Sequence, residues 1–302
     1  MAAVAEARRA AGPSWSARLR QALASRTLRR LRRNRLFVTG AVVVAAIVLL
    51  ALFADVITGV DPNRMHFRNR FTPPGHPTFW LGTDNFGRDL LSRLLHGAQV
   101  SLRIGLAVVL ITGIFGTLIG ALSGYFDRLD NPLMRVMDAL MAFPAILLAI
   151  AIAATLGPSE QNAVIALAVV YTPRTARIVR ASVLVVREME YVEAIRSAGA
   201  RHGRILFGHI LPNCMAPLIV QLTFIFAYAV LAEAILSFIG VGPPPPTPTW
   251  GNIIAEGRAY IREAFWITLL PGVAISLTVL GLNLLGDGLR DVLDPRMKVA
   301  AS

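Results

Sequence analysis

The sequence has 302 residues, of which 55% are hydrophobic and only 16% are charged, and its formal net charge is +12. Soluble domains carry about a quarter charged residues, so this composition excludes an ordinary soluble protein and indicates lipid as the solvent. The basic residues cluster between long apolar runs, which argues against nucleic acid as the partner. The single cysteine, Cys214, excludes an intrachain disulfide and a Cys/His metal cluster, and no cofactor is expected.

The first apolar run extends from Leu36 to Ala54 and carries no charge. It follows a basic segment, residues 1–35, with ten arginines and one acid, Glu6. At 1.5 Å per residue the run is long enough to cross about 30 Å of hydrocarbon. A cleaved signal peptide is the alternative, but the length of the run favours a retained membrane anchor.

Further apolar windows follow along the chain, and one of them is weak. The weak window begins at Ala163 and ends at Pro173-Arg174. The four clear windows cover residues 104–124, 137–156, 215–242 and 265–285.

The distribution of arginine decides whether the weak window spans the membrane. The segment 174–212 holds seven arginines, so the positive-inside rule places it in the cytoplasm together with residues 1–35. An even number of spans must then separate the two segments, which requires the weak window to span. We therefore expect six transmembrane helices with both termini cytoplasmic and loop 58–98 outside, although this loop holds five arginines.

The outer loop leads into the second predicted span through residues 81–103. Asn85-Phe86-Gly87 is typical of a turn, and the leucines after it share one helical face. This pattern predicts an amphipathic helix at the membrane surface.

Small residues on the second predicted span point to close packing. Gly116, Gly120 and Gly124 recur every four residues and therefore lie on one helix face, where another backbone can approach. Static helix packing is the simpler interpretation, and a moving interface along a pathway is the alternative.

Polar groups inside or at the edges of the apolar windows are a second candidate site, since a carboxylate in hydrocarbon must face the bundle interior, a cavity or a partner. Glu233 is the deepest of them. One isolated acid favours a structural hydrogen bond over a proton or ion relay. The set comprises Asp55, Asp138, Gln221, Glu233 and Asn283.

The chain has no motif for ATP hydrolysis. A nucleotide-cradling P-loop needs GxxxxGK[ST], and the single lysine, Lys298, lies in no such motif. A membrane hydrolase is disfavoured as well, because the expected topology spreads the histidines over both faces without a paired nucleophile. These are His66, His76, His96, His202 and His209.

Segment 191–212 is the most specific motif. Ala194, Ser197 and Ala198 are small residues at helical spacing, Gly199 predicts a helix stop, and a second short helix ends at Pro212. An ordinary basic loop is the alternative interpretation. The residues Glu193-Ala194-Ile195, then Gly199, then His209-Ile210-Leu211-Pro212 resemble the EAA loop of permease subunits of bacterial ABC importers, with Ile195 and His209 as departures from the family pattern.

Three further stretches resemble the C-type permease of dipeptide and oligopeptide importers, with glutathione and nickel importers as near relatives. They are residues 81–92, residues 244–252 with their P-x-P-x-W-G ending, and residues 283–295. Together the resemblances run from about residue 30 to the C-terminus.

The resemblance implies an all-α membrane fold, in which one added N-terminal helix precedes a five-helix core of the type I ABC importer (MetI-like) kind. The expected segments are a cytoplasmic basic segment (1–35), an N-terminal transmembrane helix (36–57), an extracytoplasmic loop with an amphipathic helix (58–98), the permease core (99–290) with its coupling loop (183–212), and a cytoplasmic tail (291–302).

The implied function is half of a translocation pathway for a peptide or related solute in a bacterial cytoplasmic membrane, with no enzymatic activity of its own. The implied partners are a homologous sister permease, two ABC ATPase subunits, an extracytoplasmic substrate-binding protein and the lipid bilayer. The ATPase-coupling residues would be Glu193, Ala194, Ser197, Ala198, Gly199, Leu211 and Pro212. An ion-coupled secondary transporter that uses Glu233 is the alternative function.

Overall fold

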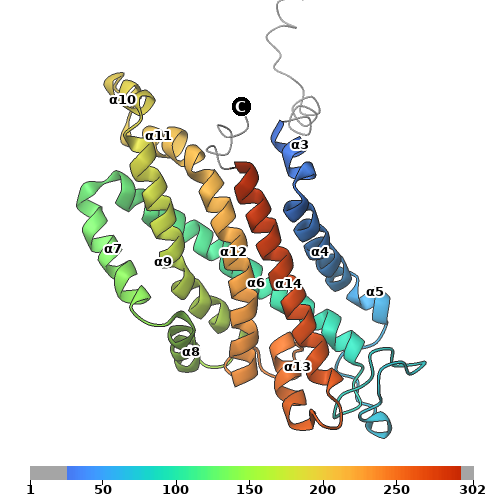
Figure 1. The fold of residues 1–302 in the computed structure, drawn as a ribbon. Helices are drawn as coiled ribbons and strands as arrows, with labels where there is room; N and C mark the ends of the chain where they lie inside the picture. Colours follow the sequence, from blue (N-terminus) through green and yellow to red (C-terminus); the bar gives the residue numbers. More distant parts are fainter. Residues whose placement is uncertain (1–25, 294–302) are drawn as a thin grey trace, which may run out of the picture.

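The computed structural model describes residues 26–293, which form a bundle of long helices with no β-strand in that range (Figure 1). Residues 1–25 and 294–302 lie outside the described part of the chain, and with them most of the predicted basic segment, Lys298 and most of the predicted tail. The main helices of the bundle are α4 (Arg35–Leu52), α6 (Leu90–Tyr125), α7 (Asp127–Met141), α8 (Ala145–Leu156), α9 (Glu160–Arg187), α12 (Met215–Ile239) and α14 (Trp266–Leu293).

Helix is the expected state for these segments because hydrocarbon offers no partner for a free backbone N–H or C=O. Polar N-cap side chains fix where several of the helices begin. Asn34 accepts a hydrogen bond from the backbone of Phe37, and Ser159 accepts one from Asn162. Thr249 accepts a hydrogen bond from Asn252 and starts α13 (Trp250–Gly257).

The six predicted spans correspond to α4, α6, the pair α7–α8, α9, α12 and α14. Among the described residues, four helical segments are long and apolar enough to cross a membrane: Arg35–Leu52, Leu90–Tyr125, His202–Ile239 and Trp266–Leu293. The pair α7–α8 passes the same test as a unit. Helix α9 is absent from this set because its arginines lower its hydropathy.

Two predicted spans have a different shape from the one expected. The window 137–156 is broken, because the chain bends by 90° between Met141 and Ala145. Pro144 sits at this break and has no N–H for a continuous helix. Conversely, the weak window does not end at Pro173: α9 continues through this buried proline to Arg187. Packing against α6 outweighs the single lost hydrogen bond.

The predicted amphipathic helix is the first part of α6. This helix has 36 residues without a break and is therefore about 54 Å long, well beyond the hydrocarbon thickness. Its first turns are buried by protein, since Leu90 and Arg93 are almost fully covered. The start of the predicted amphipathic helix is therefore covered by protein and continues directly into the second predicted span.

The bundle has two ends, which carry different elements (Figure 1). One end, which we call the arginine-rich end, carries α3 (Arg26–Arg33), α10 (Glu190–Ser197), α11 (His202–Ile205) and the C-terminal end of α14. The opposite end, the loop end, carries α13 and residues 59–89. Helix α6 packs extensively on α9, and α14 packs on α4 and α12.

Candidate functional site

The predicted helix-turn at the arginine-rich end is present as α10, a turn, and α11. Gly199 makes the turn with φ of 81°, in the left-handed region that favours glycine. A Cβ at this position would meet no described atom within 4 Å, so backbone conformation alone requires glycine here. After α11 the chain continues through a π-helical segment (Leu206–Ile210) and a 3-10 turn (Leu211–Cys214) into α12.

The outer face of this helix-turn is small and open to solvent. Glu193, Ala194, Ser197 and Ala198 are all exposed. Ile195, which departs from the family pattern, is half-buried and packs against the apolar cluster beneath the turn. The substitution therefore changes the inner face of α10 and leaves the exposed face intact.

The helix-turn is tied to the membrane helices beneath it. Val192, Ile205, Leu206 and Ile210 are buried against residues of α6 and α9. Leu211 packs on the same cluster, whereas Pro212 is exposed at the start of its 3-10 turn.

Hydrogen bonds reinforce this attachment. The Tyr125 hydroxyl at the end of α6 lies 2.9 Å from Nδ1 of His202. The side-chain amide of Asn213 donates to the Tyr191 hydroxyl at 3.1 Å and so joins α10 to the 3-10 turn before α12. A force applied to the helix-turn would thus reach α6 and α9 directly.

The three glycines of α6 pack against α9 of the same chain. A Cβ at Gly116 would lie 2.5 Å from Thr175, and one at Gly120 would lie 2.4 Å from the backbone oxygen of Ala176. A Cβ at Gly124 would lie 2.8 Å from Val183. The two helices are therefore in backbone contact along three turns, an arrangement suited to movement as one body.

A row of ion pairs joins α9 to α7. Arg177 pairs with Asp138 at 2.6 Å, and Arg187 pairs with Asp127 at 2.8 Å. Arg180 pairs with Asp130. The sequence assigned all these arginines to a cytoplasmic loop, but in the structure they lie on the second half of α9.

The predicted intramembrane polar residues do not converge on one site. Glu233 is fully buried, and one carboxylate oxygen accepts a hydrogen bond from the Ser237 hydroxyl at 2.6 Å. Its second oxygen has no hydrogen-bond partner among the described residues. Gln221 is twelve residues earlier on α12, about 18 Å along the helix, and Asn283 is on α14. The edge residue Asp55 contacts His96 at 3.0 Å.

A buried ionic cluster at the loop end was missed by the sequence reasoning. It consists of Asp84, Arg88, Arg93 and Glu256, which join the outer loop, α6 and α13. Arg88 Nε donates to Asp84 at 2.6 Å, and Arg93 Nη2 donates to Glu256 at 3.1 Å. In the sequence, only the four-residue spacing of Asp84 and Arg88 could have indicated an ion pair. Glu256 is too distant in sequence to be linked to them.

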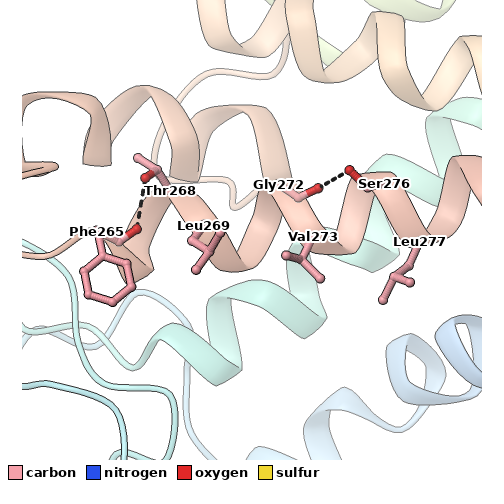
Figure 2. A pocket seen from close by; sticks show the side chains of 7 residues that line it. All are labelled: Phe265, Thr268, Leu269, Gly272, Val273, Ser276 and Leu277. Carbon is pink, nitrogen blue, oxygen red and sulfur yellow. Dashed lines mark hydrogen bonds between the residues drawn. The ribbon is translucent and has the colours of Figure 1, made fainter.

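The outer face of α14 carries a shallow groove (Figure 2). Its two hydroxyls are satisfied within the helix: Thr268 donates to the Phe265 oxygen at 3.0 Å, and Ser276 donates to the Gly272 oxygen at 2.9 Å. The groove is therefore mainly apolar, with no free hydroxyl donor along it. It is lined by Phe265, Thr268, Leu269, Gly272, Val273, Ser276 and Leu277.

Comparison with known proteins gives consistent matches. The family model described as "Binding-protein-dependent transport system inner membrane component" matches residues 114–299. A second model, described as "N-terminal TM domain of oligopeptide transport permease C", matches residues 23–74.

Relatives and a solved structure extend these matches over most of the chain. A relative from Brucella suis, named for a peptide transport system permease, is 58% identical over 90% of this chain and 92% of its own. The di/tripeptide transport system permease protein of Pseudomonas aeruginosa is 49% identical over 87% and 88% of the two chains. A chain of the MetNI methionine ABC transporter has the same fold, with a TM-score of 0.50, 22% identity, and coverage of 64% of this chain and 94% of the other.

Proposed function

Because this chain belongs to the family of binding-protein-dependent transport system inner membrane components, we propose that it is a permease subunit of an ATP-driven importer and forms half of a translocation pathway for di- or oligopeptides or a related small solute. The other half would come from a homologous sister permease. Two ATPase subunits would bind on the arginine-rich side, and an extracytoplasmic binding protein would deliver the solute. The 302 residues contain no P-loop lysine motif, in keeping with ATP hydrolysis by separate subunits.

The observation that carries this proposal is the exposed helix-turn at the arginine-rich end. Ala194, Ser197 and Ala198 present little bulk, so a partner backbone can come close, and Glu193 offers a carboxylate to a basic group on the partner. The buried cluster beneath the turn and the Tyr125–His202 contact connect this surface to α6 and α9. Closure of the ATPases on ATP would move the helix-turn, and the glycine-packed α6–α9 pair would follow.

The proposed function also implies an orientation of the chain in the membrane. The arginine-rich end, where α3 begins and α14 ends, would face the cytoplasm, and the loop end would face outward. The substitution Thr78→Cys, at an exposed position of the outer loop, tests this in intact cells in a Cys214→Ser background. We expect a membrane-impermeant thiol reagent to label the introduced thiol from outside, and labelling only after the cells are opened would contradict the topology.

The coupling role of the helix-turn is tested by placing a large side chain at one of its exposed positions. Ser197 is exposed, so Ser197→Trp leaves the membrane helices unstrained but blocks close approach of a partner. Arg262→Trp is the matched control, because Arg262 is also exposed but lies at the loop end. We expect both variants to insert normally, and only Ser197→Trp to lose ATPase co-purification and peptide uptake.

Two outcomes would contradict the proposal. Normal ATPase co-purification and uptake by Ser197→Trp would show that the helix-turn is not the docking surface. Uptake that survives ATP depletion but collapses with the ion gradient would favour an ion-coupled transporter instead.

A further inference from the structure

Arg174 occupies an unusual position in the middle of the bundle. It is the fifteenth of the 28 residues of α9, about 20 Å along the helix from either end. Its side chain is exposed. An exposed arginine is costly against lipid, so we expect this face of α9 to meet water, protein or a ligand.

The neighbouring surface of α9 supports the same conclusion. Arg177, Ala181 and Val185 are exposed and share a helical face with Arg174, since they follow it by three, seven and eleven residues. Two arginines within this stripe make it too polar for a lipid-facing surface. These arginines also lower the mean hydropathy of α9, so α9 is not among the helices that are apolar enough to cross a membrane.

Arg174 differs from the other arginines of α9 in having no acidic partner. Arg177, Arg180 and Arg187 each pair with an aspartate of α7. Within residues 26–293, Arg174 forms neither an ion pair nor a side-chain hydrogen bond at normal contact distances. Its positive charge is therefore not neutralised by the described part of its own chain.

Two aromatic rings lie beside the guanidinium of Arg174. It lies 5.9 Å from the ring centre of Tyr171 on α9 and 5.8 Å from that of Tyr228 on α12. The Tyr171 hydroxyl donates to the Tyr228 backbone oxygen at 3.4 Å, which links the two helices at this point. Aromatic faces attract and orient a guanidinium without cancelling its charge, so its N–H groups remain available.

We infer that Arg174, cradled by Tyr171 and Tyr228, is a carboxylate-binding position in the translocation pathway. The inference rests on the proposed transport of peptides. A guanidinium is suited to bidentate recognition of a carboxylate. The C-terminal carboxylate is the one anionic group that every unmodified peptide carries regardless of its side chains. A single arginine in the pathway would therefore recognise peptides as a class and not by sequence.

The test uses the complete transporter, with its sister permease and ATPases, reconstituted in vesicles with its binding protein. The probes are dialanine and dialanine amide, which differ in the C-terminal carboxylate. Loading of the binding protein is measured separately for each probe, and uptake is expressed per loaded protein. Arg174→Gln removes the charge, and Arg174→Lys keeps it. Arg103→Gln is the control, because Arg103 is an exposed arginine already paired with Glu160.

We expect Arg174→Gln to lower dialanine uptake at least tenfold and to lose the preference for dialanine over its amide. Arg174→Lys should retain part of the dialanine uptake and part of the preference for dialanine over its amide. Arg103→Gln should take up dialanine within about twofold of the wild-type rate. Assembly and ATP hydrolysis stimulated by the binding protein should survive in all three variants. Dialanine uptake by Arg174→Gln at the wild-type rate would overturn the inference. Loss of the sister permease from the Arg174→Gln complex would also overturn it, because Arg174 would then be a subunit-pairing residue.

Solvent access gives a second, independent readout. In a Cys214→Ser background, the Arg174→Cys variant should react with a water-soluble anionic thiol reagent in the assembled complex. The Ile165→Cys variant should not, since Ile165 is exposed on the opposite face of α9. An unreactive thiol in the Arg174→Cys variant would refute a pathway position. If instead the wild-type complex imports neither dialanine nor glutathione while the Arg174→Cys variant is reactive, the peptide assignment fails but the water-lined position of Arg174 stands.

Discussion

Neutralising Glu256 is expected to undock the loop end of the protein from the bundle. The buried ionic cluster contains two acids and two arginines and is therefore neutral as a whole. The side chains of Arg88, Arg93 and Asp84 are 4%, 1% and 1% exposed, and that of Glu256 is 19% exposed. Glu256→Gln keeps the size of the side chain but leaves one uncompensated positive charge among these covered groups.

The expected loss of unfolding free energy follows from the burial of the groups that Glu256 contacts. Removing one member of a buried ion pair costs about 3–5 kcal/mol, because the remaining charge stays desolvated. Since Glu256 retains some exposure, we expect the lower end of this range, about 3 kcal/mol of unfolding free energy. Arg93 would be affected most, since two of its nitrogens already lack hydrogen-bond partners among the described residues.

The assay is unfolding of the purified protein in mild detergent, combined with limited proteolysis of residues 59–89. Glu160→Gln is the matched control, because it removes the same charge from an exposed pair with Arg103, in which the Arg103 and Glu160 side chains are 64% and 34% exposed. An exposed pair contributes about 0–1 kcal/mol, so this variant should behave like the wild type. Adding Arg93→Met to Glu256→Gln restores neutrality and should recover part of the loss. Equal stabilities of the Glu256 and Glu160 variants would refute the reasoning.

Three further predictions test other parts of the structure. Gly120→Ala should destabilise the protein by about 1–3 kcal/mol, because its Cβ would meet the Ala176 oxygen at 2.4 Å, whereas Gly113→Ala, with its nearest neighbour at 3.3 Å, should have little effect in the same unfolding assay. Glu233→Gln keeps an acceptor for the Ser237 hydroxyl and should retain uptake, whereas Glu233→Leu should lower complex yield; loss of uptake in a well-assembled Gln variant would favour an ion relay. Burial raises the pKa of the Asp89 carboxyl above 3.8, so ionised Asp89 lowers stability at neutral pH, and this penalty fades as the pH falls through the raised pKa. Asp89→Asn keeps the N-cap and should be more stable than the wild type at neutral pH, by a margin that shrinks as the pH falls through the raised pKa of Asp89. A margin that grows towards acid would contradict the assignment.

The sequence by itself determined the class of protein and the location of its helices. Long uncharged runs can be solvated only by lipid, and in lipid the backbone must form helices, so hydropathy alone located most spans. Local chemistry also placed the helix-turn, because Gly199 interrupts a helical pattern at a position where the structure has positive φ. The glycine spacing on α6 similarly indicated close packing. Each of these features depends on residues that are neighbours in the chain.

Tertiary structure decided what surrounds each polar group. Hydropathy could not show that α9 passes through Pro173, because the compensation comes from α6, a different helix. It could not assemble the buried ionic cluster, since Glu256 is 163 residues from Arg93. Nor could it separate Arg174 from Arg177, three residues apart on one helix, of which only Arg177 meets an aspartate of α7. The energy of a charge in a membrane depends on which group lies opposite it in space, and the fold decides this pairing.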